Sequence, residues 1–133
     1  MIVYIFLFLF VLYFIYGYVT SHNVHKIYGT IAKSPYELRK GLMYRKNKLE
    51  KREGMLFPMK TQINSMWMKN TYIPLDIIFL DEKKRIIGYV INAEPLSEKS
   101  LSIHKPSNYV LEMNGNSVFD LDMKIGDVVY FME

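Results

Sequence analysis

Two carboxylates interrupt stretches of this chain that are otherwise apolar. Asp76 lies within the run 75–80, and Glu112 lies between Leu111 and Met113. Two neighbouring carboxylates can act as general acid and general base, or they can bind a hard cation through their oxygen atoms. A carboxylate buried inside a strand is otherwise paired or hydrogen-bonded. Asp76 and Glu112 are therefore the first candidates for chemistry in this sequence.

Four further residues complete a candidate ligand-binding site with these carboxylates: Arg45, Trp67, Lys69 and Asn70. An aromatic face, cationic groups and an amide are the kinds of group that line small-molecule pockets. We expect these residues and the two carboxylates to face one pocket at the mouth of the fold, where a small molecule or a protein would bind. The pattern assigns no catalytic residue.

A purely structural interpretation of the same residues stays open. Asp76 and Asn70 can hydrogen-bond backbone N–H groups around the turn at Pro74, and Glu112 can fix strand register by pairing with a basic side chain. The candidate partners of Glu112 are Arg39, Arg45 and Lys69. Trp67, flanked by two methionines, is expected to be largely buried as a core anchor.

The familiar catalytic and metal-binding patterns are missing from the sequence. It has no cysteine, His22 and His25 follow the apolar N-terminal segment, and His104 lies in a polar stretch. No Ser–His pair, no histidine or cysteine cluster and no glycine-rich phosphate loop is recognisable. We therefore predict no metal site and no cofactor.

The charge pattern argues against a nucleic-acid partner. The formal net charge is +4, but basic and acidic residues are mixed in segments such as 48–53 and 81–85. A nucleic-acid surface needs a longer basic stripe with interleaved aromatic residues. The chain beyond the N-terminal segment has the length of one small domain, which we expect to be monomeric.

Residues 1–19 contain no charged side chain and one glycine. As a helix they would span roughly 28 Å, about the thickness of a bilayer core. We therefore predict a single-pass transmembrane anchor over residues 1–20, a tether over 21–27 and a domain over 28–133. The partner of residues 1–19 would be the lipid bilayer, and the protein would be localised to a membrane.

Two alternatives to a retained anchor stay open. A cleaved signal peptide would need a basic start and a small-residue cleavage site, which the sequence lacks; a buried core helix of a soluble protein is the other. The side of the membrane is also open. Basic residues after the segment favour a cytoplasmic domain, but folded domains can translocate regardless of charge. These residues are Lys26, Lys33, Arg39 and Lys40.

The pattern of residues 28–133 is mainly β with one short helix. Ser34 at the N-cap, Pro35 at the first helical position and Glu37 in the first turn predict a helix over 35–43. Apolar runs predict about five to seven short strands, which is typical of a small β-sandwich or barrel with the helix over one opening. The clearest runs are 54–59, 66–68, 75–80, 86–91, 109–113 and 128–131.

Several strings in this region resemble the DUF192 family of uncharacterised proteins. They are Glu-Leu-Arg-Lys-Gly-Leu-Met-Tyr-Arg (37–45), Gly-Met-Leu-Phe-Pro (54–58), Trp-Met-Lys-Asn-Thr-Tyr-Ile-Pro-Leu-Asp-Ile-Ile-Phe (67–79), Tyr-Val-Leu-Glu-Met-Asn-Gly (109–115) and Lys-Ile-Gly-Asp (124–127). The resemblance covers about residues 28–133. It implies a mainly β fold and an N-terminal export or anchor segment, but no reaction, because the family has no established activity. The turn 114–117 and the Ser34-Pro35 pair depart from the family pattern.

Two functions are compatible with these observations. The first is a membrane-anchored accessory module that binds a ligand or a partner through residues 67–76. The alternative is a membrane-tethered, hydrolase-like enzyme that uses Asp76 and Glu112, with Lys69 as electrostatic support. The two differ in one geometric requirement, because an enzyme of this kind needs the two carboxylates to converge on one concave site.

Overall fold

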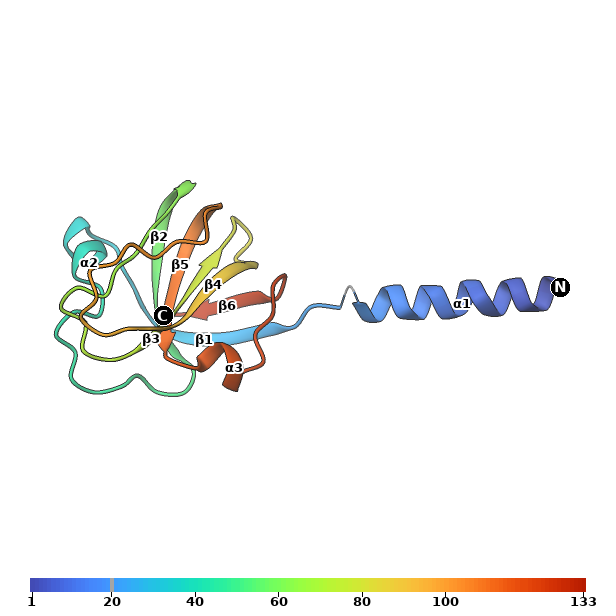
Figure 1. Cartoon of the computed structure of the whole chain (residues 1–133), viewed down its shortest axis with the longest axis horizontal. Helices are drawn as coiled ribbons and strands as arrows, with labels where there is room; N and C mark the ends of the chain where they lie inside the picture. Colours follow the sequence, from blue (N-terminus) through green and yellow to red (C-terminus); the bar gives the residue numbers. More distant parts are fainter. Residues whose placement is uncertain (20) are drawn as a thin grey trace.

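The computed structural model describes residues 1–19 and 21–133 of the chain. An N-terminal helix, α1 (Ile2–Val19), precedes a β-rich domain with two short helices (Figure 1). The strands are β1 (Val24–Ile31), β2 (Glu53–Ile63), β3 (Leu75–Leu80), β4 (Ile86–Ala93), β5 (Pro106–Asn114) and β6 (Val128–Met132). The short helices are α2 (Pro35–Lys40) and α3 (Ser117–Asp120). The prediction of a mainly β domain is confirmed.

All six strands form one sheet in the order β4-β3-β5-β2-β1-β6. Neighbouring strands are antiparallel from β4 to β2, whereas β1 runs parallel to both β2 and β6. The sheet curls until its edges approach at one end, where Arg85 bridges Val128 and the Val129 N–H donates to the Lys84 carbonyl over 2.9 Å. The architecture is therefore a curled half-barrel and not a two-sheet sandwich.

Local sequence signals located several elements correctly. β3 coincides with the predicted run 75–80, and it forms the predicted hairpin with β4. Ser34 caps α2 as predicted, but the helix ends at Lys40 and not at residue 43. The run 66–68 forms no strand, since Met66 makes one isolated bridge to Leu101.

β1 begins at Val24, so residues 24–27, which we expected in the tether, belong to the sheet. Its side chains alternate between exposed and buried at the start of the strand, and His25 takes a buried position. The His25 Nε2 atom lies 2.7 Å from the Asp127 Oδ2 atom. Burial opposes ionisation of Asp127, but hydrogen bonds from His25 and from the backbone of Asn23 and Lys124 outweigh it and lower its pKa. This pair joins the start of the domain to the turn before β6.

The sheet buries side chains on both faces, and each face has its own hydrophobic core. All six residues of β3 are buried, with Ile77 and Phe79 on one face and Ile78 and Leu80 on the other. The first core cluster contains Ala32, Leu42, Leu49, Met55, Phe57, Met68, Ile73, Leu75, Ile77, Phe79, Ala93 and Val110. The second core cluster contains Ile27, Leu56, Ile78, Leu80, Ile86, Leu111, Met113, Val118, Met123 and Val129. Residues 21–133 therefore hold both cores.

Asp76 is fully buried in β3, on the face of the second core cluster. Its Oδ1 atom accepts the N–H groups of Asn92 (2.9 Å) and Asn116 (3.0 Å), and its Oδ2 atom accepts that of Val118 (2.8 Å). These bonds tie the end of β4 and the start of α3 to a central strand. The structural interpretation of Asp76 is the one that the fold supports.

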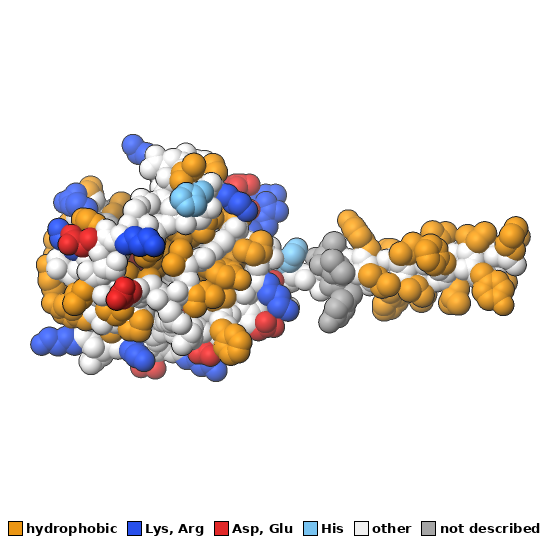
Figure 2. Space-filling view, in the orientation of Figure 1, with side chains coloured by type: hydrophobic (Ala, Val, Ile, Leu, Met, Phe, Trp, Pro, Cys, Tyr) orange, Lys and Arg blue, Asp and Glu red, His pale blue; other side chains and the backbone are white. Residues whose placement is uncertain are grey.

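The helix α1 extends away from the domain with its side chains exposed (Figures 1 and 2). From Met1 to Tyr16 the exposed fraction of each large apolar side chain lies between 45% and 93%. Within the described part of the chain, no helix has both the length and the apolarity needed to cross a membrane. The transmembrane helix predicted over residues 1–20 is therefore not supported by the fold, and Thr20 lies outside the described residues.

We expect Asp76→Asn to lower the free energy of unfolding by about 1–3 kcal/mol, because the Nδ2 atom of asparagine would replace Oδ2 and leave the buried Val118 N–H without an acceptor. Urea unfolding followed by circular dichroism would measure the loss. Asp122→Asn is the matched control: its carboxylate is exposed, 3.6 Å from Lys124, and its removal should cost at most about 1 kcal/mol. Equal costs for the two variants would contradict the tie that we assign to Asp76.

Candidate functional site

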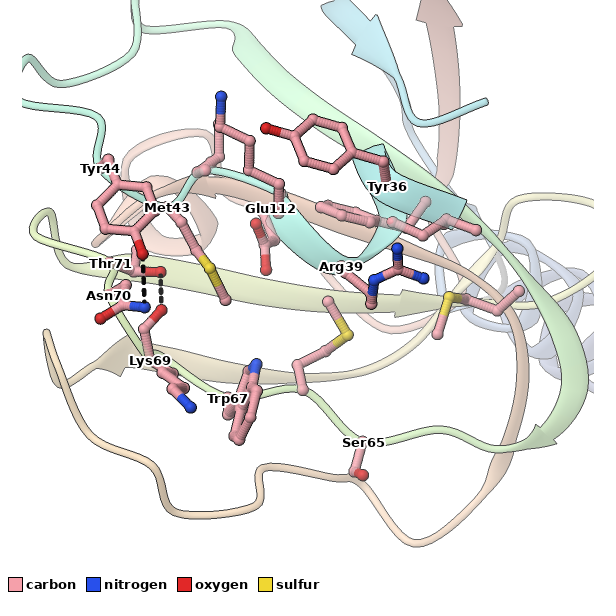
Figure 3. Close-up of a pocket in the computed structure, with 17 residues that line it drawn as sticks. Tyr36, Arg39, Met43, Tyr44, Ser65, Trp67, Lys69, Asn70, Thr71 and Glu112 are labelled. Atoms are coloured by element: carbon pink, nitrogen blue, oxygen red, sulfur yellow. Dashed lines mark hydrogen bonds between the residues drawn. The ribbon is translucent and has the colours of Figure 1, made fainter. Parts of the chain in front are cut away.

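A cavity of about 700 Å³ opens beneath α2 (Figure 3). One wall is formed by α2 and residues 41–44, the other by residues 65–71, and β2 and β5 contribute its floor. Most of the wall is apolar or aromatic. These lining residues are Tyr36, Leu38, Gly41, Leu42, Met43, Tyr44, Phe57, Met59, Met66 and Trp67. The polar lining residues are Arg39, Lys40, Ser65, Lys69, Asn70, Thr71 and Glu112.

The cavity exists because α2 stands off the sheet. None of the residues of α2 is buried, although a surface helix normally buries one apolar face. The helix is held instead by its ends. At its start, the Ser34 hydroxyl accepts the Glu37 N–H (3.1 Å) and the Glu37 carboxylate accepts the Ser34 N–H (2.9 Å). A helix fixed in this way leaves room between itself and β2.

The turn after α2 needs glycine. Gly41 has φ +49° and ψ −129°, a conformation that L side chains rarely adopt. A Cβ atom at this position would lie 3.1 Å from Cζ of Phe57 and 3.8 Å from Oε2 of Glu112. The backbone of Gly41 therefore passes directly over the floor of the cavity, next to the Glu112 carboxyl group.

Glu112 lies at this floor, in the middle of β5, with Met55 and Ile77 as its cross-strand neighbours. Its side chain is 5% exposed, and burial raises its pKa to about 8. Among the described residues, no hydrogen bond or ion pair reaches its carboxyl group. In that part of the chain, every side-chain nitrogen or oxygen atom that is fully enclosed has a hydrogen-bond partner. Because the Glu112 oxygens have none, they are not fully enclosed and remain accessible from the cavity. Figure 3 shows the group pointing into it.

The basic partner expected for Glu112 is therefore not present, since none of the three candidates bonds to its carboxyl group. Arg45 turns away from the cavity to the Asn47 carbonyl (2.9 Å) and the Glu53 carboxylate (3.3 Å). Lys69 lies 3.7 Å from the Glu98 carboxylate, and Arg39 lines the cavity without an ion pair among the described residues. The prediction of a structural ion pair at Glu112 is wrong.

Trp67 is 46% exposed, so the prediction that it is a buried core anchor is also wrong. Met68 takes the core position instead, and its N–H donates to the Ser97 carbonyl over 2.9 Å. The segment follows a loop path, so strand alternation does not decide which side chain is buried. Trp67 lines the cavity, and the Lys69 ammonium group lies 5.0 Å from the centroid of its ring.

Asn70 closes one end of the cavity together with Tyr44. The Asn70 Nδ2 atom donates to the Tyr44 hydroxyl (2.9 Å), and the Tyr44 N–H donates to the Asn70 carbonyl (2.8 Å). Both residues have positive φ angles, 53° and 65°. These two bonds fasten the segment after α2 to the opposite wall and so fix the width of the cavity (Figure 3).

The structure thus brings four of the six predicted site residues to one cavity: Trp67, Lys69, Asn70 and Glu112. Arg45 faces Glu53, and Asp76 faces the second core cluster on the opposite side of the sheet from Glu112. Asp76 and Glu112 therefore do not converge, because Ile77, the next residue after Asp76, is the one opposite Glu112. Among residues 1–19 and 21–133, no three His, Asp or Glu side chains are grouped to hold a metal ion.

The sequence predicted a short helix over one opening and named Arg39 as a candidate partner of Glu112, but it did not predict the other residues that this region supplies to the cavity. They are Tyr36 and Lys40 of α2, and Met43 and Tyr44 of the segment that follows. The signal in the sequence was the spacing of the apolar residues in this helix. Tyr36 and Leu38 are two positions apart, so they do not form the regular apolar stripe with which a helix packs on a core. A helix of this kind covers a space more readily than it packs on a core.

Comparisons with known proteins agree with this fold. The sequence model of the DUF192 family, described as uncharacterized ACR, matches residues 18–131. A crystal structure from Sinorhizobium meliloti 1021, provisionally named a transcription regulator, has 39% identity and a TM-score of 0.70, covering 74% of this chain and 76% of that one. A protein of unknown function from Novosphingobium aromaticivorans DSM 12444 has 39% identity and a TM-score of 0.71, covering 75% of this chain and 71% of that one.

No protein with a curated description matches the chain. The family match spans most of the sequence and includes both core clusters and the cavity. This chain therefore belongs to the DUF192 family, as its sequence strings predicted.

Proposed function

We propose that this protein is a binding module whose small-molecule ligand occupies the cavity beneath α2. One observation carries the proposal: Glu112 is buried in a central strand with no partner among the described residues, and its carboxyl group faces the cavity. Buried carboxyl groups in proteins are normally hydrogen-bonded. A ligand that forms a hydrogen bond at the floor would supply the missing partner.

The size and lining of the cavity support a small molecule. Its volume of about 700 Å³ lies within the range of roughly 300–1,000 Å³ that is usual for ligand sites. Such sites combine apolar and aromatic walls with a few polar groups that orient the ligand. Here the aromatic rings of Tyr36, Tyr44 and Trp67 and several methionines form the wall, and Glu112 is the polar group at the floor.

The alternative, a hydrolase-like enzyme using Asp76 and Glu112, has less support. The oxygens of Asp76 accept three backbone N–H groups and face the second core cluster. A general acid and a general base must both reach the reacting atoms. Among the described residues that line the cavity, Glu112 is the single carboxylic acid, which fits a recognition role better than one in a carboxylate pair.

We also propose that α1 attaches the module to a lipid bilayer. The large apolar side chains of residues 1–16 are all exposed, and none of them belongs to either described core cluster. An uninterrupted apolar surface of this kind is costly in water and favourable in hydrocarbon. The anchor would concentrate the binding domain at the membrane surface.

The only tryptophan of the chain lines the cavity, so its emission should report an occupied site. We expect a ligand that fills the cavity to shift Trp67 emission to shorter wavelength, because it displaces water from the indole ring. A fluorescence titration of a panel of small molecules would measure this. Met59→Trp, which adds a second reporter on the floor of the cavity, should respond to the same compounds. A panel that leaves both reporters unchanged would contradict the proposed function.

We expect Glu112→Gln to stabilise the protein at alkaline pH. The Glu112 pKa is raised to about 8 in the folded state, so the wild-type protein is most stable below the ordinary value of about 4.5. It loses stability as the pH rises toward 8. The variant should match the wild type near pH 5 and exceed it by up to about 5 kcal/mol above pH 8.

Urea unfolding at several pH values would measure this difference. Glu82→Gln is the control. The Glu82 side chain is exposed and its ion pair with Arg85 is long, at 3.9 Å, so the effect of this substitution on stability should vary little with pH. If Glu112→Gln were instead less stable than the wild type at every pH, the carboxylate would have a protein partner after all.

We expect the full chain to sediment with membranes and to resist an alkaline carbonate wash, since an inserted apolar helix is released only by detergent. A chain that begins at Ser21 retains both core clusters and should stay in the supernatant. Release of the full chain by carbonate alone would indicate a peripheral or a cleaved protein.

A further inference from the structure

We propose that the ligand of the cavity beneath α2 is a small organic anion, whose negative group lies at the mouth and whose largely apolar body carries a hydrogen-bond acceptor for Glu112 at the floor. This inference rests on the proposed function, and it adds the charge class of the ligand. The geometry carries it: three basic side chains line the cavity, and its single acidic lining residue lies at the floor.

The three basic residues are Arg39, Lys40 and Lys69. Arg39 has no ion pair among the described residues, and the nearest recorded partner of Lys40 is the ring of Tyr36, 5.8 Å from its Nζ atom. Lys69 lies 3.7 Å from an exposed Glu98 carboxylate, a pair of the kind that contributes little in water. All three charges are therefore available to an anion, and a guanidinium group suits a carboxylate or a phosphate.

The acidic residue of α2 does not compensate these charges. The Glu37 carboxylate accepts the N–H groups of Lys33 (2.6 Å) and Ser34 (2.9 Å), and it is not among the lining residues of the cavity. The mouth of the cavity is thus cationic.

Glu112 is the group that could oppose an anion. The titratable side chains that share its cavity are Tyr36, Arg39 and Lys40 from α2, Tyr44 from the following segment, and Lys69 from the opposite wall. Its cross-strand neighbours Met55 and Ile77 carry no charge. A carboxyl group this buried is protonated at neutral pH, as its raised pKa indicates, and it then donates a hydrogen bond without adding negative charge.

A cationic ligand fits this arrangement less well. It would have to pass three basic side chains, and it would gain an ion pair only after Glu112 had lost its proton. An uncharged ligand would leave the three cations without a role in binding. The charges of the lining therefore favour an anion over both.

The position of the cavity indicates that the ligand comes from water. β1 leads from the point where the chain enters the domain toward α2, and its eight residues cover about 26 Å. α2 lies at the end of the domain remote from α1 (Figure 1), and α2 forms one wall of the cavity. A ligand dissolved in the aqueous phase would reach it more directly than a lipid held in the bilayer.

Three probes with one apolar body and different head groups test the inference: octanoate, octan-1-ol and octylammonium. The full chain would be held in a non-ionic amphipol, which contributes no tryptophan fluorescence and little free detergent. Trp67 emission would be titrated at low salt, with the amphipol alone as blank. We expect octanoate to bind at least tenfold more tightly than octylammonium at pH 7, and acetate, the head group without the body, to bind far more weakly.

The pH dependence gives an independent readout. If the anion binds only to protonated Glu112, its affinity should fall about tenfold between pH 7 and pH 9, because the group ionises near pH 8. Glu112→Gln should abolish this fall, and circular dichroism would verify that the variant is folded. The wild-type pH profile tests the same point without any substitution.

Arg39→Gln should weaken octanoate binding several-fold, and this loss should shrink at high salt. Arg52→Gln is the matched control, since Arg52 is exposed and does not line the cavity. Tightest binding of octylammonium, with an affinity that rises above pH 8, would overturn the inference but leave a ligand-binding module. Equal binding of all three octyl probes would also overturn it. If no probe changed Trp67 emission, the inference and the proposed function would both fall.

Discussion

The central strands β3 and β5 are buried on both faces, and this constraint governs the rest of the structure. Each of the two strands carries one carboxylate at a position where burial is complete or nearly so. Asp76 points to the second core cluster, and Glu112 points to the cavity on the other face. The desolvation of the two carboxyl groups is compensated in different ways. Asp76 accepts three backbone N–H groups, whereas Glu112 has no protein partner among the described residues and retains its proton.

The two faces of the sheet also differ in how their helices are held. On the Asp76 face, α3 and the end of β4 are drawn against the core by hydrogen bonds. On the Glu112 face, α2 itself buries no residue. Its capping box orders its first turn, Ala32 and Leu42 on either side of it are anchored in the first core cluster, and the Tyr44–Asn70 bonds fasten the segment that follows. The capping bonds satisfy the free N–H groups of the first turn without any contact to the sheet. A helix can thus remain ordered above an open cavity.

Features that depend on near neighbours in the chain could be predicted, and features that depend on distant ones could not. Ser34 and Glu37 predict the start of α2, and the apolar run at 75–80 predicts β3. β1 was missed because its buried His25 is compatible with a strand only through Asp127, 102 positions away. The exposure of Trp67 depends on the path of a loop. Glu112 was recognised as anomalous, but its lack of a basic partner follows from contacts that the sequence does not show, those of Arg45 with Glu53 and of Lys69 with Glu98.

A structural role alone does not account for Glu112. A methionine or leucine side chain at this position would extend the first core cluster toward Phe57 and would carry no desolvation cost, and replacing buried polar groups by apolar ones is often neutral or stabilising. The protein instead has a carboxyl group beside Gly41. Any larger residue in place of Gly41 would bring its Cβ atom close to the Phe57 ring. A carboxyl group without a bonded partner lies at the floor, and three basic side chains line the same cavity, of which Lys69 alone has an ion pair among the described residues. Under the function that we propose, one anionic ligand would give the floor a hydrogen-bond acceptor and the mouth a counter-charge.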